Sequence, residues 1–133
     1  MKRFLSIAAL LFLAFTLTQP VHAARSVPLP KFENEVILEA GAPGGAAKVH
    51  DAILVGAAQM NWTVVSDAND TVRLGLTVRN KHAVEVDVRI HENSVSVDYV
   101  SSINLRYRDG AIHPNYGNWI KRLLDAARKA AHL

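Results

Sequence analysis

The chain has 133 residues, and its 15 lysines and arginines exceed its 12 aspartates and glutamates by only three. It contains no cysteine, which excludes disulfides, zinc sites held by thiolates and a lipid-modified cysteine. Without such crosslinks the fold depends on a packed apolar core, and a chain of this length is long enough for one domain to form it.

Residues 1–23 have the pattern of a secretory signal peptide. Residues 1–3 are Met-Lys-Arg, residues 4–17 are almost entirely apolar, and residues 21–23 read Val-His-Ala, a small-x-Ala cleavage site. The apolar run of about 14 residues is shorter than the roughly 20 that a spanning helix needs, so cleavage after Ala23 is favoured over a retained anchor. We therefore expect a periplasmic protein of 110 residues, with a formal charge of +1 and no transmembrane span.

Charge is unevenly distributed over this mature chain. Residues 104–133 carry a formal charge of +4, whereas residues 24–103 carry −3. Such a basic segment can attract an envelope protein or an anionic component of the cell envelope, or it can be the solvent-exposed face of a helix. Nucleic-acid binding is not expected, because the protein is exported and nearly neutral, and because Tyr116 and Trp119 fall on the apolar side of a predicted helix.

Residues 24–45 are predicted to form an extended lead-in that ends in a hinge. They contain three prolines and the sequence Gly-Ala-Pro-Gly-Gly at residues 41–45. Such residues interrupt regular structure, although residues 36–38 could form a short strand within the segment.

Regular structure is expected to begin at Ala46. From there apolar residues recur every three or four positions, which predicts an amphipathic helix that ends near Asn61 and Trp62. A single α+β domain is accordingly expected over residues 46–133.

Three segments after this helix alternate strictly between apolar and polar residues. They lie at residues 72–78, 84–90 and 95–99, and a shorter segment at residues 62–66 precedes them. The connections are too short for a crossover helix, so the strands are predicted to be antiparallel. The face that they share predicts the sheet side of the core: Val72, Leu74, Leu76, Val78, Val84, Val86, Val88, Ile90, Val95, Val97 and Tyr99.

The phase of the alternation predicts the register of two hairpins. Leu76 and Val86 fall on the same face only if a three- or five-residue loop around residues 80–82 joins the first pair of strands. Placing Ile90 opposite Val95 calls instead for a two-residue Glu-Asn turn, whose asparagine can adopt positive φ.

A second amphipathic helix is predicted to begin at residues 112–114, with a proline near its start. Its basic residues lie opposite an apolar stripe that includes Tyr116, Trp119 and Ile120. The predicted fold is therefore α+β, in the order helix, four-stranded antiparallel sheet, helix, with both helices on one sheet face. The other face is expected to be solvated: Arg73, Arg79, Glu85, Asp87, Arg89, Ser96 and Asp98.

A catalytic constellation is one interpretation of the polar residues near the second helix. Asp98, Ser101 or Ser102, and His113 could supply the acid, nucleophile and base of a small hydrolase. No Gly-x-Ser-x-Gly motif surrounds the serines. In the structural alternative, the serines satisfy backbone groups at a strand end and His113 caps the helix.

Neither a metal nor a cofactor is expected. His82 and His91 fall at opposite ends of one predicted strand and so cannot share an ion. The glycines at residues 41–45 precede any strand–helix unit that could bind a phosphate.

Three segments carry a resemblance to known proteins. They read RNKHAVEVDV at residues 79–88, YVSSINLRY at 99–107 and IHPNYGNWI at 112–120. The chain resembles, over residues 46–127, a family of small exported proteobacterial proteins of unknown function, many of which are called lipoproteins. The resemblance implies a location in the periplasm or outer envelope, although this chain lacks the lipid-attachment cysteine.

The most specific part of this resemblance, residues 99–119, supplies a candidate recognition patch. Its residues are Ser102, Asn104, Tyr107, His113 and Asn118. The same residues can instead shape turns and cap a helix. The sequence therefore predicts a non-enzymatic binding or assembly module of the cell envelope, with the small hydrolase as the alternative.

Overall fold

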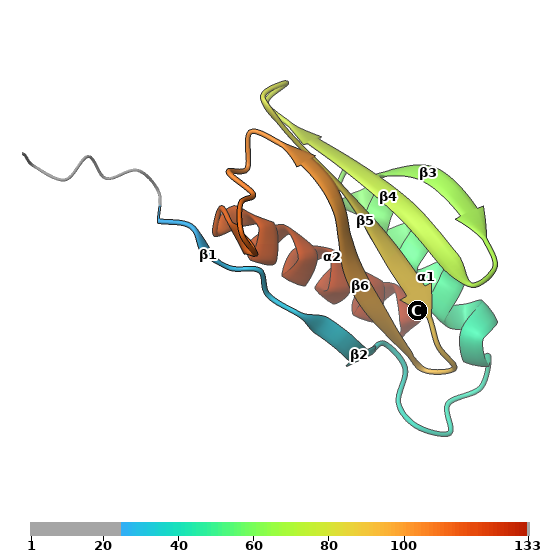
Figure 1. The fold of residues 1–133 in the computed structure, drawn as a ribbon. Helices are drawn as coiled ribbons and strands as arrows, with labels where there is room; N and C mark the ends of the chain where they lie inside the picture. Colours follow the sequence, from blue (N-terminus) through green and yellow to red (C-terminus); the bar gives the residue numbers. More distant parts are fainter. Residues whose placement is uncertain (1–24, 133) are drawn as a thin grey trace, which may run out of the picture.

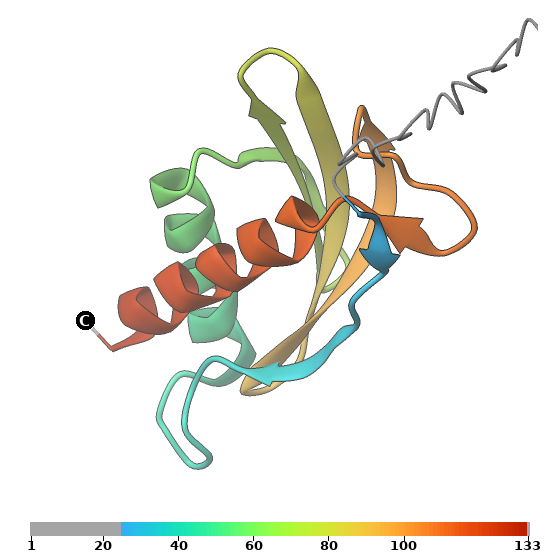
Figure 2. The ribbon, with the colours of Figure 1, turned by 90° about the vertical axis from the view of Figure 1, so that its left-hand side faces the viewer.

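The computed structural model describes residues 25–132, so the predicted signal peptide lies outside the described residues. The described chain is α+β, as predicted, and both helices lie on the same side of an antiparallel sheet (Figures 1 and 2). The elements are β1 (Val27–Pro28), β2 (Phe32–Val36), α1 (Gly45–Gln59), β3 (Thr63–Ala68), β4 (Thr71–Val78), β5 (His82–Ile90), β6 (Ser94–Ile103), β7 (Ala111–Ile112) and α2 (Asn115–Ala131).

The main sheet has five strands in the order β2-β6-β5-β4-β3, and every neighbouring pair is antiparallel. Strands β3 to β6 form a meander, which follows from their short connections. Helix α1 links the two edge strands, β2 and β3, across one face of the sheet (Figure 1). Strands β1 and β7 form a separate two-stranded sheet near the start of α2.

Both predicted registers are confirmed. Val78 pairs with His82 around the three-residue turn 79–81. Ile90 pairs with Val95, as the two-residue turn between β5 and β6 requires. These registers place every apolar residue of the alternation on one face, because a slip by one residue would reverse the faces.

Strand β2 is the element that the prediction lacked, and it makes the sheet five-stranded rather than four-stranded. It lies at residues 32–36 of the predicted lead-in, before the short strand considered at residues 36–38. Beyond its end, the N–H groups of Ile37 and Leu38 donate to the Asn93 carbonyl oxygen, at 2.9 and 3.0 Å.

The predicted turn between β5 and β6 differs from the structure in one respect. Asn93 does not have positive φ, so the backbone conformation expected for this residue is wrong.

The core lies between the sheet and the two helices. The predicted sheet face is buried, except that Val78 and Tyr99 are only partly buried. On α2, Tyr116 is 1% exposed and is among the largest fully buried side chains. Trp119 belongs to the same apolar stripe but is only partly buried, because it lies at the border of the core.

The backbones of the two helices lie close together at Gly56 of α1. A Cβ atom on Gly56 would lie 2.7 Å from the backbone nitrogen of Ala127 and 3.0 Å from its Cα. These contacts are with backbone atoms, which cannot move aside as a side chain can. The absence of a side chain at Gly56 therefore lets α1 and α2 pack together on one sheet face.

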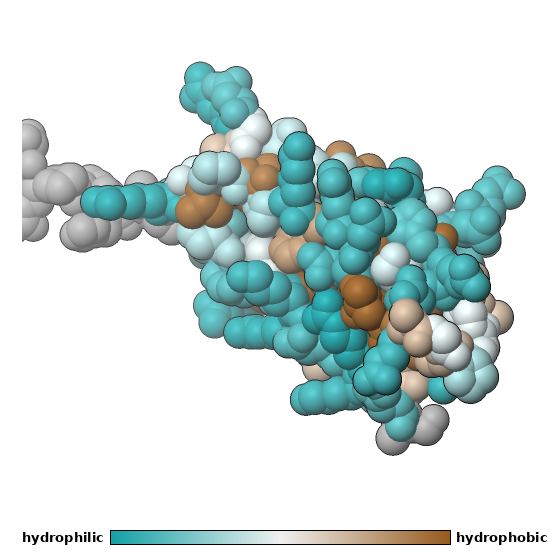
Figure 3. Space-filling view, turned by 90° about the horizontal axis from the view of Figure 1, so that it is seen from below, coloured by the Kyte–Doolittle hydropathy of each residue, from teal (hydrophilic) through white to brown (hydrophobic). Residues whose placement is uncertain are grey.

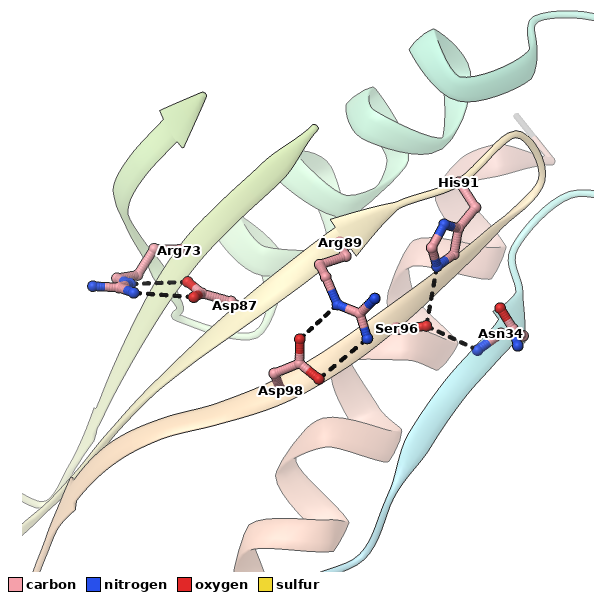
Figure 4. Close-up of polar contacts among 7 residues, drawn as sticks. All are labelled: Asn34, Arg73, Asp87, Arg89, His91, Ser96 and Asp98. Carbon is pink, nitrogen blue, oxygen red and sulfur yellow. Dashed lines mark hydrogen bonds and ion pairs between the residues drawn. The ribbon is translucent and has the colours of Figure 1, made fainter. Parts of the chain in front are cut away.

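The outer face of the sheet carries two cross-strand ion pairs (Figure 4). Arg73 donates two hydrogen bonds to Asp87, at 2.8 and 3.0 Å, and Arg89 donates two to Asp98, at 2.6 and 3.3 Å. Asp87 and Asp98 are direct cross-strand partners, so the two arginines offset a repulsion between carboxylates. The hydrogen bond from Arg73 lowers the pKa of Asp87 below its ordinary value.

Ser96 departs from the prediction that this face is solvated. It is 3% exposed, because the added strand β2 lies beside it. Its hydroxyl accepts the Asn34 N–H at 3.0 Å and lies 3.1 Å from Nε2 of His91 (Figure 4). The missing fifth strand thus explains this error as well.

Strand β3 is the other edge of the sheet, and all six of its residues are exposed.

The face of the molecule drawn in Figure 3 is mostly hydrophilic, with apolar side chains in small separate areas. Neither helix in the described part of the chain is long and apolar enough to cross a membrane.

Candidate ligand-binding groove

The candidate recognition patch predicted from the sequence contains part of a tyrosine cluster. Tyr99 stacks on Tyr107, with ring centroids 4.2 Å apart, and meets Tyr116 edge to face at 5.9 Å. The Ser102 hydroxyl lies 2.7 Å from the Tyr99 hydroxyl. Burial raises the pKa of Tyr116, whose phenol therefore stays neutral. Tyr107 is the exposed edge of this cluster.

Asn104 connects the end of β6 to the turn between β4 and β5 through hydrogen bonds. It has φ 58°, its side-chain amide donates to the Lys81 carbonyl at 2.6 Å, and its own carbonyl accepts Nδ1–H of His82 at 2.8 Å. These bonds use the polar atoms that a ligand would need. The geometry therefore matches the structural interpretation of Asn104.

His113 lies just before α2 and accepts a hydrogen bond from the first residue of the helix. Its backbone N–H donates to the Leu105 carbonyl at 2.8 Å, and its Nδ1 accepts the N–H of Asn115, the first residue of the helix, at 3.1 Å. An unpaired N–H group at a helix start needs such an acceptor. His113 supplies it from just outside the helix.

Three residues of the hydrolase alternative, Asp98, Ser102 and His113, have other hydrogen-bond partners. Asp98 pairs with Arg89 on the outer face of the sheet, and Ser102 pairs with Tyr99. Within residues 25–132, no hydrogen bond joins His113 to Ser101 or Ser102. The five patch residues likewise share no direct hydrogen bond with one another in this part of the chain.

A groove lies beside this patch, at the end of the molecule where α1 ends and α2 begins. It consists of two cavities of about 480 and 280 Å³ that share Val78, Arg79, Trp119 and Arg122. Cavities of this size accommodate small-molecule ligands. We call the pair the tryptophan groove. Figure 2 shows α1, the β4–β5 hairpin and α2, the segments that line it.

The larger cavity is the apolar end of the groove. Its apolar lining consists of Met60, Trp62, Leu76, Val78 and Trp119. Trp62 is set in place by the end of α1, where Asn61 adopts φ 64° and the Trp62 N–H donates back to the Ala57 carbonyl at 2.8 Å. This arrangement is a Schellman motif, which turns the chain sharply out of a helix.

The Trp62 indole leaves one polar atom without a partner. The residue is 5% exposed, and its Nε1–H is the only buried side-chain nitrogen or oxygen among the described residues that lacks a hydrogen-bond partner. A buried unpaired donor costs about 1–3 kcal/mol. Because Nε1 is itself buried, other atoms of Trp62 line the cavity.

The smaller cavity is the polar end of the groove. Its lining includes Arg79, His82, Asn115, Asn118 and Arg122. Asn115 and Asn118 come from the first turns of α2, where the helix dipole favours negative charge and no acidic residue occupies the first turn. Of the predicted patch, only Asn118 reaches this cavity.

Both arginines of the groove lack an ion-pair partner. Within residues 25–132, no carboxylate lies within 4.0 Å of the Arg79 or Arg122 guanidinium, and no acidic residue lines either cavity. Arg79 is held by a tight turn in which both Arg79 and Asn80 have positive φ and the Lys81 N–H donates to the Val78 carbonyl at 3.1 Å. The groove therefore has a positive electrostatic potential at its polar end.

The groove could not be predicted from the sequence, because its parts are far apart in the chain. The sequence pattern places Trp119 on the apolar stripe and Arg122 on the solvated helix face, but it does not indicate that the β4–β5 turn lies beside them. No local signal in the sequence indicates this contact.

A further cavity of about 510 Å³ lies between the start of α1 and the β3–β4 turn. Two of its ionisable lining residues pair with each other, because Nε2 of His50 lies 2.7 Å from Oδ2 of Asp67. In the part of the chain that is described, no cluster of three or more His, Cys, Asp or Glu residues could hold a metal ion.

Comparisons of the chain with protein-family models, with curated proteins and with solved structures found no match. The fold and the groove are therefore the basis for any functional proposal. The resemblance to small exported proteins remains a prediction from the sequence.

Proposed function

We propose that the protein is a non-enzymatic binding module of the cell envelope, located in the periplasm, and that the tryptophan groove is its ligand site. The signal peptide predicted at residues 1–23 supports the location. The groove supports the binding role, since it combines an apolar wall with a few convergent polar groups.

The observation that carries this proposal is a pair of exposed arginines, Arg79 and Arg122, that have no ion-pair partner among the described residues and that lie beside an apolar cavity. Guanidinium groups in such a position favour a ligand that carries a carboxylate or a phosphate. The recognition patch lacks this property, because Asn104 and His113 already have partners within the fold.

The experiment uses the mature protein, immobilised and incubated with an extract of the cell envelope. After washing, the retained small molecules are identified by mass spectrometry. We expect a low-molecular-weight component that is retained by the wild-type protein and lost in Met60→Trp. Met60 is an exposed residue that lines the apolar end, so a larger tryptophan side chain there narrows the cavity with little effect on the core.

Tyr107→Ala is the matched control, since it removes an exposed aromatic from the recognition patch and leaves the groove intact. Retention that Tyr107→Ala abolishes and Met60→Trp preserves would move the ligand site to the patch. Retention that neither change affects would contradict a groove-based function. Turnover of p-nitrophenyl acetate that disappears in His113→Asn would support the hydrolase alternative instead.

A further inference from the structure

The two ends of the tryptophan groove differ in chemistry. Trp62, Trp119 and Leu76 line the larger cavity, whereas the smaller one is lined mainly by polar side chains, including Arg79 and Arg122. The cavities are adjacent, because four residues line both of them. A ligand that fits both ends must itself be polar at one end and apolar at the other.

The charge of the ligand follows from the unpaired cations. A guanidinium presents a planar fork of donors that matches the two oxygens of a carboxylate or the oxygens of a phosphate. Arg79 and Arg122 both line the region that the two cavities share, and no described carboxylate neutralises them. A cationic or zwitterionic head group would place positive charge beside them.

We infer that the tryptophan groove binds a single-chain anionic amphiphile, an inference that rests on the proposed binding function. Its carboxylate or phosphate head lies between Arg79 and Arg122, and its chain lies along Met60, Trp62 and Trp119. The groove thus selects both the charge and the apolar body of its ligand.

The inference is tested by isothermal titration calorimetry of the mature protein with probes below their aggregation thresholds. The anionic probes are octanoate, decanoate and decyl phosphate, and decyltrimethylammonium and inorganic phosphate are the comparison ligands. Decanoate and decyl phosphate should both bind, and affinity should rise by about threefold to fourfold for each CH2 between octanoate and decanoate. The cationic probe and inorganic phosphate should bind at least tenfold more weakly.

Two arginine variants locate the head group. Arg79→Asn and Arg122→Gln should each raise the dissociation constant for decanoate about tenfold, as expected for the loss of a charged hydrogen bond. Lys81→Gln is the control, because Lys81 belongs to the same turn as Arg79 but does not line either cavity. Trp119→Ala should reduce the chain-length dependence and leave the preference for anions.

Equal binding of the cationic and anionic probes would overturn the inference, as would equal binding of inorganic phosphate and decyl phosphate. Binding only to vesicles that contain anionic lipid, with none to monomeric decanoate, would also overturn it and indicate a membrane-surface site. If envelope extracts still yield a ligand that Met60→Trp loses, the proposed binding function survives any of these results. If no such ligand is retained, the proposed function itself fails.

Discussion

Left-handed backbone conformations in this protein occur mostly where asparagine or aspartate can adopt them. Of the nine non-glycine residues with positive φ in the described chain, seven are Asn or Asp, and the two exceptions are Arg79 and Arg106. A long side chain in this region costs more than asparagine does, because its Cβ crowds the backbone. Arg79 also provides a cation to the groove. At this position an arginine therefore favours ligand binding but lowers the stability of the fold.

Arg79→Asn should therefore raise the free energy of unfolding by about 0.5–1 kcal/mol, because asparagine tolerates positive φ. Urea denaturation followed by circular dichroism measures the change. Asn80→Arg is the matched control, since it places an arginine at the neighbouring positive-φ position and should lower stability by a similar amount. A loss of stability in Arg79→Asn would mean that the arginine contributes contacts that outweigh its backbone conformation.

His50 links α1 to the edge strand β3 in a way that depends on pH. The hydrogen bond to Asp67 raises the pKa of His50 above the ordinary value of 6.5, and a contact with Asp51 adds to this effect. A raised pKa in the folded state means that protonation stabilises the fold. This contribution is complete below the unfolded-state pKa and is lost as pH rises through the folded-state pKa.

His50→Gln should accordingly be less stable than the wild type at about pH 5.5 and nearly equal to it at about pH 8.5. Because both partners are partly exposed, the difference should stay within about 1 kcal/mol. Urea titrations of both proteins across this pH range measure it. A difference that grows toward high pH would show that neutral His50, rather than its charged form, stabilises the contact with Asp67.

Among the elements, those with uninterrupted periodicity could be predicted from the sequence. Strands β4, β5 and β6 alternate strictly, and parity alone determined their pairing. Strand β2 could not be predicted in this way. Its ladder is irregular between Phe32 and Glu35, Asn34 has φ 53°, and its partner β6 is distant in sequence. Long-range pairing of an irregular edge strand leaves no local signal.

The contact between α1 and α2 can be tested at Gly56. Alanine is favoured over glycine within helices by about 1 kcal/mol, but here its Cβ would overlap the backbone of Ala127. We expect Gly56→Ala to lower the free energy of unfolding by about 1–3 kcal/mol, as overpacking does. Val55→Ala, at an exposed position of the same helix, should change it little. A stabilised Gly56→Ala protein would mean that the helices can separate without loss of packing.

At the scale of the whole molecule, the sequence predicted the layer arrangement but not the groove. Amphipathic helices and an alternating sheet must bury their apolar sides together, so the fold class follows from the pattern. The groove depends on where three separate segments end relative to one another. A turn, a helix end and a second helix bring Arg79, Trp62 and Trp119 together. The local sequence of each segment does not indicate where the other two segments lie.

Maturation at Ala24 is a further prediction for the whole molecule. Cleavage after residue 23 would leave β1, which begins at Val27, and the entire described fold intact. Intact-mass analysis of protein recovered from the exporting host should therefore give Ala24 as the first residue. Protein that begins at Met1 in a membrane fraction would show instead that the segment is retained as an anchor.

The composition of the groove gives the protein a built-in optical reporter. The chain has two tryptophans, and both line the apolar end of the groove. Essentially all of its tryptophan emission must therefore arise there, with the buried indole of Trp62 and the partly exposed ring of Trp119 as its two sources. An amphiphile entering the groove would displace water from the partly exposed Trp119 ring, so the emission spectrum would register occupancy without any attached label.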